Sequence, residues 1–268
     1  MLHAVYRVGD MDATIEYYKK HFGMRQLRYR DIPEDKYTNA FLGFGPEDTN
    51  FGLELTKNYG VDSYDLGSGF GHFALALEDV YGAVDSIKAA GGKVTRDAGP
   101  VKGGQRVIAF VEDPTGYKWE LLTRKGPIKE PIAQVNLRVT NLDASIKYYT
   151  ECLGCKLLRR TDRPDQKYSL AFLGYGGEEE TCVFELTWNW GQDSLDAYDK
   201  PFVGEGYAQV AVSTKDVYKT AEDIRAAGGK ITREPGPLPG LKTKIMSTVD
   251  PDGWKVSFVD LQDFLSEL

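Results

Sequence analysis

The stretch RVGDMDATIEYYKKHFGM at residues 7–24 returns as RVTNLDASIKYYTECLGC at residues 138–155, an offset of 131 residues. A second stretch, DVYGAVDSIKAAGGKVTRDAGP at residues 79–100, returns as DVYKTAEDIRAAGGKITREPGP at residues 216–237, an offset of 137 residues. Self-similarity at a fixed spacing is the mark of a repeated structural unit. The chain of 268 residues therefore contains an internal duplication.

The two offsets differ because the second half has six extra residues between Asp193 and Gln209. The length is also that of about two ordinary domains. We predict two tandem homologous domains with a short linker and tail, which cover 1–125 (first domain), 126–131 (linker), 132–262 (second domain) and 263–268 (tail).

Each half carries the order strand, helix, strand, strand, strand twice. Apolar alternation predicts the strands, and apolar residues spaced three and four apart predict the helices. The first half has predicted strands at 2–8, 25–30, 38–44 and 51–56 with a helix at 12–22, then strands at 72–77, 93–95, 106–111 and 118–122 with a helix at 80–90. We therefore predict an α+β fold of four βαβββ modules, numbered one to four from the N-terminus.

Composition and charge exclude several classes of protein. The chain has 33 Lys+Arg against 40 Asp+Glu, a net charge of −7, so its field repels polyanions such as nucleic acid. No run of apolar residues is long enough to span a membrane, and the first residues lack the pattern of a signal peptide. We expect a cytoplasmic protein that binds neither nucleic acid nor membrane.

The three cysteines do not indicate a disulfide framework, because an odd number cannot pair completely. Cys152 and Cys155 have the spacing of a redox or zinc pair. The repeat aligns them with His21 and Met24, however, so these positions accept any side chain that packs. We interpret both cysteines as packing residues at the end of a helix.

Two polar residues interrupt the apolar strands of each module, one on its first strand and one on its last. In GLELT at residues 52–56, Glu54 lies between two leucines, so its side chain points to the opposite face of the strand. The eight positions are His3, Glu54, His72, Glu120, Gln134, Glu185, Gln209 and Ser257. Imidazole, carboxylate and amide oxygen suit a divalent metal such as Zn²⁺ or Ni²⁺, so we expect a metal site.

The sequence permits two ways of pairing the modules into sites. If neighbours pair, the two sets are His3, Glu54, His72 and Glu120, and Gln134, Glu185, Gln209 and Ser257. If the halves cross, the two sets are His72, Glu120, Gln134 and Glu185, and His3, Glu54, Gln209 and Ser257. Either pairing leaves one complete site and one that lacks a carboxylate.

Five motifs stand out along the chain, namely LHAVYRVGD at 2–10, GLELTKNYG at 52–60, GHFALAL at 71–77, GPVKGGQRVIAFVEDPTGYKWELL at 99–122 and FELTWNWG at 184–191. Through these motifs nearly the whole chain resembles the glyoxalase I (lactoylglutathione lyase) family of the vicinal-oxygen-chelate superfamily, and more narrowly its fused two-domain plant form. The resemblance implies a redox-neutral isomerisation of the hemithioacetal of methylglyoxal and glutathione, which gives S-D-lactoylglutathione. It also implies a site built across the two halves.

The resemblance carries the family's site onto particular residues of this sequence. The implied metal ligands are His72, Glu120, Gln134 and Glu185. The metal would hold the hemithioacetal oxygens and stabilise the enediolate while a glutamate moves the proton from C1 to C2. We choose Glu120 for this shuttle, with Glu185 opposite it. Ser257 stands where the family has a glutamate, so the second site, of His3, Arg7, Glu54, Asn58 and Gln209, is expected to be inactive.

The implied substrate contacts lie near these ligands in the sequence. Arg138 and Asn189 are assigned to the γ-glutamyl end of glutathione, and Arg7 and Asn58 are their equivalents at the second site. We expect Lys102 to bind the glycine carboxylate, and Phe110 and Phe172 to line the pocket for the thiohemiacetal substituent, with Ile108 and Leu170.

Two rival functions on the same fold are an extradiol dioxygenase and a metal-free binding protein that sequesters a toxic compound. The dioxygenase needs two histidines and one carboxylate around Fe(II), whereas the crossed site has one histidine. The chain lacks a long insertion between FLGFG and LELT, a feature that it shares with the nickel-activated family members. We therefore expect one Ni²⁺, ahead of Co²⁺, Mn²⁺ or Zn²⁺, and a monomer, because the fusion supplies both halves of the site.

Overall fold

The computed structural model describes residues 1–268 except 199, 240 and 268, and it confirms the four βαβββ modules. Module one holds β1 (His3–Arg7), α1 (Met11–Tyr17), β2 (Arg25–Ile32), β3 (Tyr37–Gly43) and β4 (Gly52–Asn58). Module two holds β5 (Phe70–Leu77), α2 (Val80–Ala89), β6 (Lys93–Pro100), β7 (Val107–Glu112) and β8 (Lys118–Thr123). Module three holds β9 (Ile132–Arg138), α3 (Leu142–Glu151), β10 (Lys156–Arg163), β11 (Tyr168–Gly174) and β12 (Val183–Asn189). Module four holds β13 (Tyr207–Thr214), α4 (Val217–Ala226), β14 (Lys230–Pro237), β15 (Lys244–Val249) and β16 (Lys255–Asp260), followed by α5 (Leu261–Leu265).

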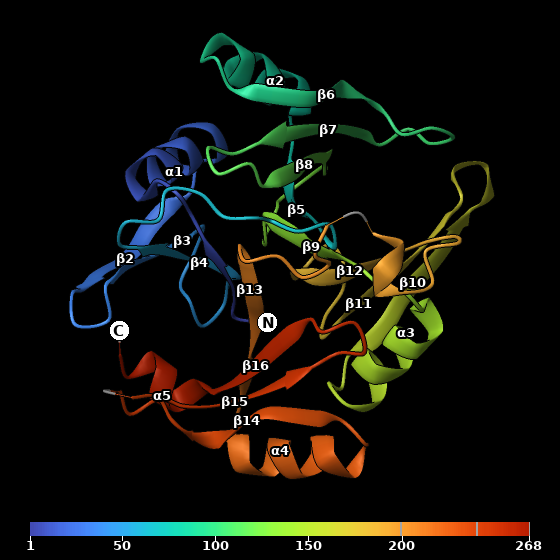
Figure 1. The fold of residues 1–268 in the computed structure, drawn as a ribbon. Helices are drawn as coiled ribbons and strands as arrows, with labels where there is room; N and C mark the ends of the chain where they lie inside the picture. Colours follow the sequence, from blue (N-terminus) through green and yellow to red (C-terminus); the bar gives the residue numbers. More distant parts are fainter. Residues whose placement is uncertain (199, 240, 268) are drawn as a thin grey trace.

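The strands form two eight-stranded sheets, and each sheet combines one module from each half (Figure 1). One sheet has the order β10-β11-β12-β9-β5-β8-β7-β6, which joins modules three and two. The other has the order β14-β15-β16-β13-β1-β4-β3-β2, which joins modules four and one. The modules meet through the antiparallel pairs β5/β9 and β1/β13. The halves therefore cross.

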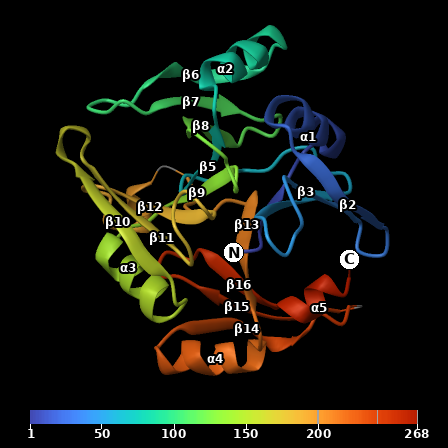
Figure 2. The same cartoon turned by 180° about the vertical axis from the view of Figure 1, so that it is seen from behind.

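The four main helices begin at an Asp or Asn whose side chain accepts a backbone N–H in the first turn, as N-caps do. These residues are Asp10, Asp79, Asn141 and Asp216. The helices cover the outer face of each sheet, and the views from the front and from behind agree on this (Figures 1 and 2). The opposite, concave face of each sheet is left for polar side chains.

The helix predicted at 12–22 has two parts. It is α-helical over α1 and continues as a π-helical turn, Tyr18–Phe22, which ends at Gly23 with a φ of 75°. A π-turn is wider than an α-turn, because its hydrogen bonds join residues five apart. Within this turn the rings of Tyr18 and Phe22 stack, with centroids 5.4 Å apart and an interplanar angle of 16°.

Strand alternation separates the core from the concave face. Leu53 and Leu55 are buried beneath the helices in the main hydrophobic core, while Glu54 between them points to the concave side. The same division holds for Phe184, Glu185 and Leu186 on β12. The polar residues singled out in the sequence therefore share the concave faces of the two sheets.

The C-terminal residues are not an independent tail. Helix α5 spans the boundary that the sequence places at residue 262, and Phe264 is buried in a small apolar cluster of module one and module four residues. Within the described residues, no helix combines the length and apolar character needed to cross a bilayer.

Candidate active site

The concave face of the sheet of modules two and three encloses a cavity of about 860 Å³. His72 on β5, Glu120 on β8, Gln134 on β9 and Glu185 on β12 all line it. The cavity therefore draws its walls from both halves of the chain and contains the complete set of four predicted ligands.

The strand register explains why these four side chains converge. Ala74 on β5 pairs with Glu120 on β8 and with Gln134 on β9, so all three side chains point to the same face. Ala74 is small and leaves space between the two longer side chains. His72 lies two residues before Ala74 and so shares this face.

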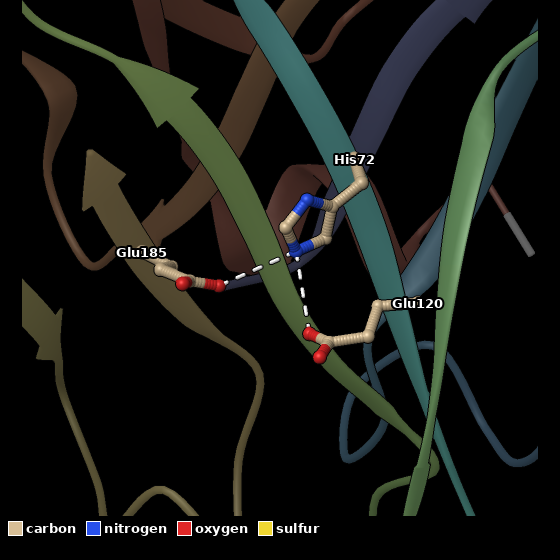
Figure 3. A group of neighbouring side chains, drawn as sticks. All are labelled: His72, Glu120 and Glu185. Carbon is tan, nitrogen blue, oxygen red and sulfur yellow. Dashed lines mark ion pairs between the residues drawn. The ribbon is translucent and has the colours of Figure 1, made fainter. Parts of the chain in front are cut away.

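Three of the side chains point toward one another, as Figure 3 shows. The Nε2 atom of His72 lies 3.4 Å from Oε2 of Glu120 and 3.4 Å from Oε2 of Glu185. One ligand atom from each of the three residues lies within 4.8 Å of the others, close enough to hold one metal ion. Two carboxylates and an imidazole give this cluster a donor set that suits a borderline divalent metal.

Three polar atoms around this cluster lack the hydrogen bond that buried polar groups normally have. His72 Nε2, Gln134 Oε1 and Glu185 Oε2 are buried and accept or donate no hydrogen bond within the described part of the chain. Burial alone would lower the pKa of His72, but Glu120 and Glu185 outweigh it and raise that pKa to about 9. A proton on His72 thus offsets the two carboxylates, and a divalent cation would do the same. The residues present fit a metal.

The predicted substrate contacts also line this cavity. The guanidinium of Arg138 donates to the backbone oxygens of Ser68 and Phe70, at 2.7 and 3.2 Å, which fixes it at the boundary between the halves. The Asn189 amide donates to Gln192 at 2.7 Å. Lys102, on the loop before β7, is exposed, and its Nζ atom lies 3.9 Å from Asp165 across the mouth.

Phe110 and Phe172 lie on either side of the ligand cluster. The Phe110 ring meets the ring of His72 edge-on, with centroids 5.3 Å apart. The guanidinium of Arg159 lies over the Phe172 ring in a cation–π contact, 3.7 Å from the ring centroid. Ile108 and Leu170 complete this apolar part of the lining, as expected.

The sequence analysis missed a group of cationic side chains around the cavity. The lining includes Arg96, Arg106, Arg124, Arg159 and Arg163. Arg159 is held by Glu178 through two hydrogen bonds of 3.0 and 2.9 Å. The repeat contained the signal for this pair, because Arg28 and Glu47 occupy the equivalent positions in the first half and also form an ion pair. Cations at this density favour an anionic substrate.

The second predicted site lies on the other sheet and is differently organised. His3 Nε2 is 3.0 Å from Glu54 Oε2, and Glu54 also accepts a hydrogen bond of 2.7 Å from Asn39. Ser257 donates to Gln209 at 2.7 Å. The polar groups of the second site therefore form ion pairs and hydrogen bonds with other protein groups. Arg7 donates to the backbone oxygen of Glu205, and the backbone N–H of Asn58 donates to the hydroxyl of Tyr64.

Comparison with known proteins agrees with the fold and with the internal duplication. The model of the Glyoxalase/Bleomycin resistance protein/Dioxygenase superfamily matches residues 1–121 and again residues 131–258. The chain belongs to this superfamily. The two matches cover nearly the whole chain, and each corresponds to one half of the repeat.

Members with the same two-domain arrangement are found in plants. A relative from Arabidopsis thaliana named "Probable lactoylglutathione lyase, chloroplastic" is 61% identical over 100% of this chain and 75% of its own length. A relative from Oryza sativa subsp. japonica named "Lactoylglutathione lyase" is 61% identical over 100% of this chain and 91% of its own. The crystal structure of glyoxalase I from Zea mays, 59% identical, superposes with a TM-score of 0.94 over 100% of this chain and 94% of that one. The resemblance to the fused plant form is confirmed.

The cytoplasmic location that we expected is contradicted by the Arabidopsis relative, whose name places it in the chloroplast. Our expectation rested on the absence of a leader pattern in the first residues. A leader that is removed leaves no trace in the composition of the remaining chain, so its absence did not identify the compartment.

Proposed function

We propose that the protein isomerises the hemithioacetal of methylglyoxal and glutathione to S-D-lactoylglutathione, in a single working site between the halves. The observation that carries this proposal is the convergence of His72, Glu120, Gln134 and Glu185 in one cavity with cationic walls. The relatives from Arabidopsis and Oryza, which match the whole chain, carry the name of this activity.

His72, Glu120, Gln134 and Glu185 would hold the metal. Ni²⁺ is our first choice, ahead of Co²⁺, Mn²⁺ and Zn²⁺. When bound, a divalent cation supplies Lewis-acid stabilisation of negative charge on the substrate oxygens. The negative charge of Glu120 and Glu185 would be balanced by such a cation held with His72 and Gln134.

The protein residues move one proton and no electrons. The Glu120 carboxylate takes the proton from C1 of the hemithioacetal, and the electron pair of that C–H bond passes into the enediolate. Glu120 then returns the proton to C2, so one side chain acts first as base and then as acid. The hydroxyl proton of the C1 oxygen passes to the C2 oxygen, which leaves a thioester carbonyl at C1 and a hydroxyl at C2. Glu185 lies opposite across His72 and would serve the other enantiomer of the hemithioacetal.

The remaining residues bind and orient glutathione. Arg138 and Asn189 would hold the γ-glutamyl end, and Lys102 the glycine carboxylate, which suits the excess of cations in the lining. The substituent of the thiohemiacetal would lie against Phe110 and Phe172, whose rings exclude water from the reacting carbons. We further propose that the protein acts as a monomer, since one chain supplies both halves of each sheet.

The test is an activity assay on protein stripped of metal and reloaded in turn with Ni²⁺, Co²⁺, Mn²⁺ and Zn²⁺. We expect S-D-lactoylglutathione to form only after reloading, and fastest with Ni²⁺. Oxygen uptake with a catechol in the presence of Fe²⁺ would favour the dioxygenase. Tight binding of the hemithioacetal without turnover under any metal would favour the sequestration protein.

A further inference from the structure

Helix α5 and the residues after it fill the concave face on which the second site lies. In Figures 1 and 2, α5 lies between the strands of module one and those of module four. Its Phe264 side chain is buried with Leu2, Phe41, Ala211, Ile245 and Val259, which come from both modules. We call residues 261–267 the C-terminal plug.

The plug places an aromatic ring directly on the second site. Phe264 stacks on the ring of His3, with centroids 5.5 Å apart and an interplanar angle of 27°. The guanidinium of Arg28 contacts two rings, 4.7 Å from the centroid of Phe41 and 4.6 Å from that of Phe264. Phe264 therefore contacts the histidine ring and makes a second cation–π contact with Arg28.

The plug also places a carboxylate against the cations of this face. Glu267 Oε2 lies 3.3 Å from Arg30 and 3.8 Å from Arg28, and its other oxygen accepts a hydrogen bond from Thr243. One turn earlier, Asp263 accepts from the backbone N–H and the ammonium group of Lys244. An apolar ring and a carboxylate are thus held by the same face.

The residues that hold the plug have equivalents in the working cavity. Arg28, Phe41 and Glu47 correspond to Arg159, Phe172 and Glu178 at the offset of 131, and all three equivalents line the cavity of about 860 Å³. In the working cavity, Phe172 carries Arg159 on its face, just as Phe41 carries Arg28. Phe264 therefore lies where an apolar group of a ligand would contact Arg159 and Phe172.

We propose that the C-terminal plug is an internal ligand of a second binding site, which accepts a glutathione conjugate with an aromatic S-substituent once the plug leaves. The ligand class rests on the proposed function, because it is taken from the equivalent residues of the working cavity. The aromatic substituent replaces Phe264 between His3 and Arg28, and a ligand carboxylate replaces Glu267. With Ser257 in place of a glutamate, this site binds and does not isomerise.

The attachment of the plug explains why it remains in place. The plug follows directly on β16, and the Asp260 side chain caps α5 by accepting the N–H of Asp263. A tethered group acts at an effective concentration in roughly the millimolar range. A free conjugate at micromolar concentration does not displace it, so the intact chain binds one conjugate, in the working cavity.

The experiment counts binding sites with S-(4-nitrobenzyl)glutathione by titration calorimetry. It compares the intact chain, a chain that ends at Asp260, and the full-length double variant Phe264→Ala, Glu267→Gln. We expect one equivalent of probe on the intact chain and two on each opened variant. Removal of the plug should raise the affinity of the second site for the probe by about 10²-fold or more. Lyase activity of both variants stays unchanged, because no residue of the working cavity is altered.

The matched control is Arg28→Ala in the double variant, which should remove the second binding event and leave the first. One equivalent on both opened variants, with native circular dichroism, overturns the proposal, as does a second equivalent on the intact chain. An intact chain that binds no probe contradicts the proposed function instead. In that case, binding of one equivalent of probe by the two opened variants still supports the second site. If the opened variants also bind no probe, the second site is overturned.

Discussion

Glu120 and Ser257 occupy equivalent positions on β8 and β16. The two concave faces of the molecule therefore differ in the side chain at this position. Glu120 faces His72 in an open cavity, next to a buried glutamine and a second glutamate without hydrogen-bond partners in the described structure. Ser257 bonds to Gln209 and to Ser247, at 2.7 and 2.8 Å. One face therefore holds buried polar atoms without hydrogen bonds in the described structure, whereas the polar groups of the other face form hydrogen bonds with one another.

The comparison shows how two equivalent faces of one fold can differ in their polar contacts. A hydroxyl at Ser257, where the other face has the carboxylate of Glu120, forms hydrogen bonds with its polar neighbours. The C-terminal plug buries Phe264 against what remains. The sheet is unaffected, because its stability depends on the opposite face, where the apolar residues pack beneath the helices.

The largest difference between the two faces should appear on removal of one carboxylate. Glu120→Gln should lower kcat by about 10²–10⁴-fold or more while largely sparing substrate affinity, since an amide can bind but cannot accept the proton. Glu54→Gln, which removes a carboxylate from the second face, should turn over like the unaltered protein. Steady-state kinetics on both variants decide this, and activity of Glu120→Gln within about tenfold of the unaltered protein would exclude Glu120 as the shuttle.

Metal content should show the second-largest difference between the two faces. Gln134→Ala and Glu185→Ala should lose metal and activity together, as should His72→Ala, because each removes a donor from the cluster. His3→Ala, whose ring contacts Phe264 of the plug, should retain both. Elemental analysis after dialysis gives the answer, and a metal-free, inactive His3→Ala beside an active Gln134→Ala would reverse our assignment of the faces.

Substrate affinity should show a smaller difference. Arg138→Ala should raise KM by about 10–100-fold, the loss expected on removal of a hydrogen bond to a charged group, with a smaller change in kcat. Arg7→Ala, the equivalent change at the second face, should leave KM unchanged. Arg138 also bonds to the backbone of Ser68 and Phe70, so the melting temperature is measured in parallel. Equal KM values for the two variants would count against Arg138 as a glutathione contact.

The smallest expected difference lies in the turns that lead into β8 and β16. Burial raises the pKa of Asp113 to about 6 and that of Asp250 to about 7, both from 3.8. Between about pH 4 and these raised pKa values, the folded state keeps a proton that the unfolded chain has released. The free energy of unfolding therefore falls as pH rises from about 4, and it stops falling above the folded-state pKa of each group.

Asp250→Asn should therefore flatten the decline of stability between about pH 4 and 7, by at most about 1.4 kcal/mol per pH unit. Asp113→Asn should flatten it only to about pH 6. Urea denaturation across this pH range measures both slopes. An Asp250→Asn variant that keeps the original slope would show that the carboxyl ionises normally in the folded protein.

The sequence carried most of the local structure and the identity of the polar positions. Apolar alternation predicted the strands, and the repeat marked Gln134 and Glu185 as the equivalents of His3 and Glu54. It also contained the Arg28 and Arg159 pair, which we overlooked because an arginine on an exposed strand reads as an ordinary surface residue. The π-helical turn at Tyr18–Phe22 could not be predicted, because helical periodicity is too coarse to distinguish it from an α-turn.

By itself, the sequence determined that this protein is built from four βαβββ modules and that two sets of polar residues face one side of its sheets. These properties depend on residues close together along the chain, where side-chain periodicity decides which face is buried. Only the tertiary structure decided that β5 pairs with β9 and β1 with β13, since either pairing of modules buries the same apolar residues. The position of the plug was likewise undetermined, because a five-residue helix has too few contacts of its own to fix where it docks. Its position follows from the ring of His3 and the cations of Arg28 and Arg30, which belong to module one and reach the plug only after β1 has paired with β13 of the second half.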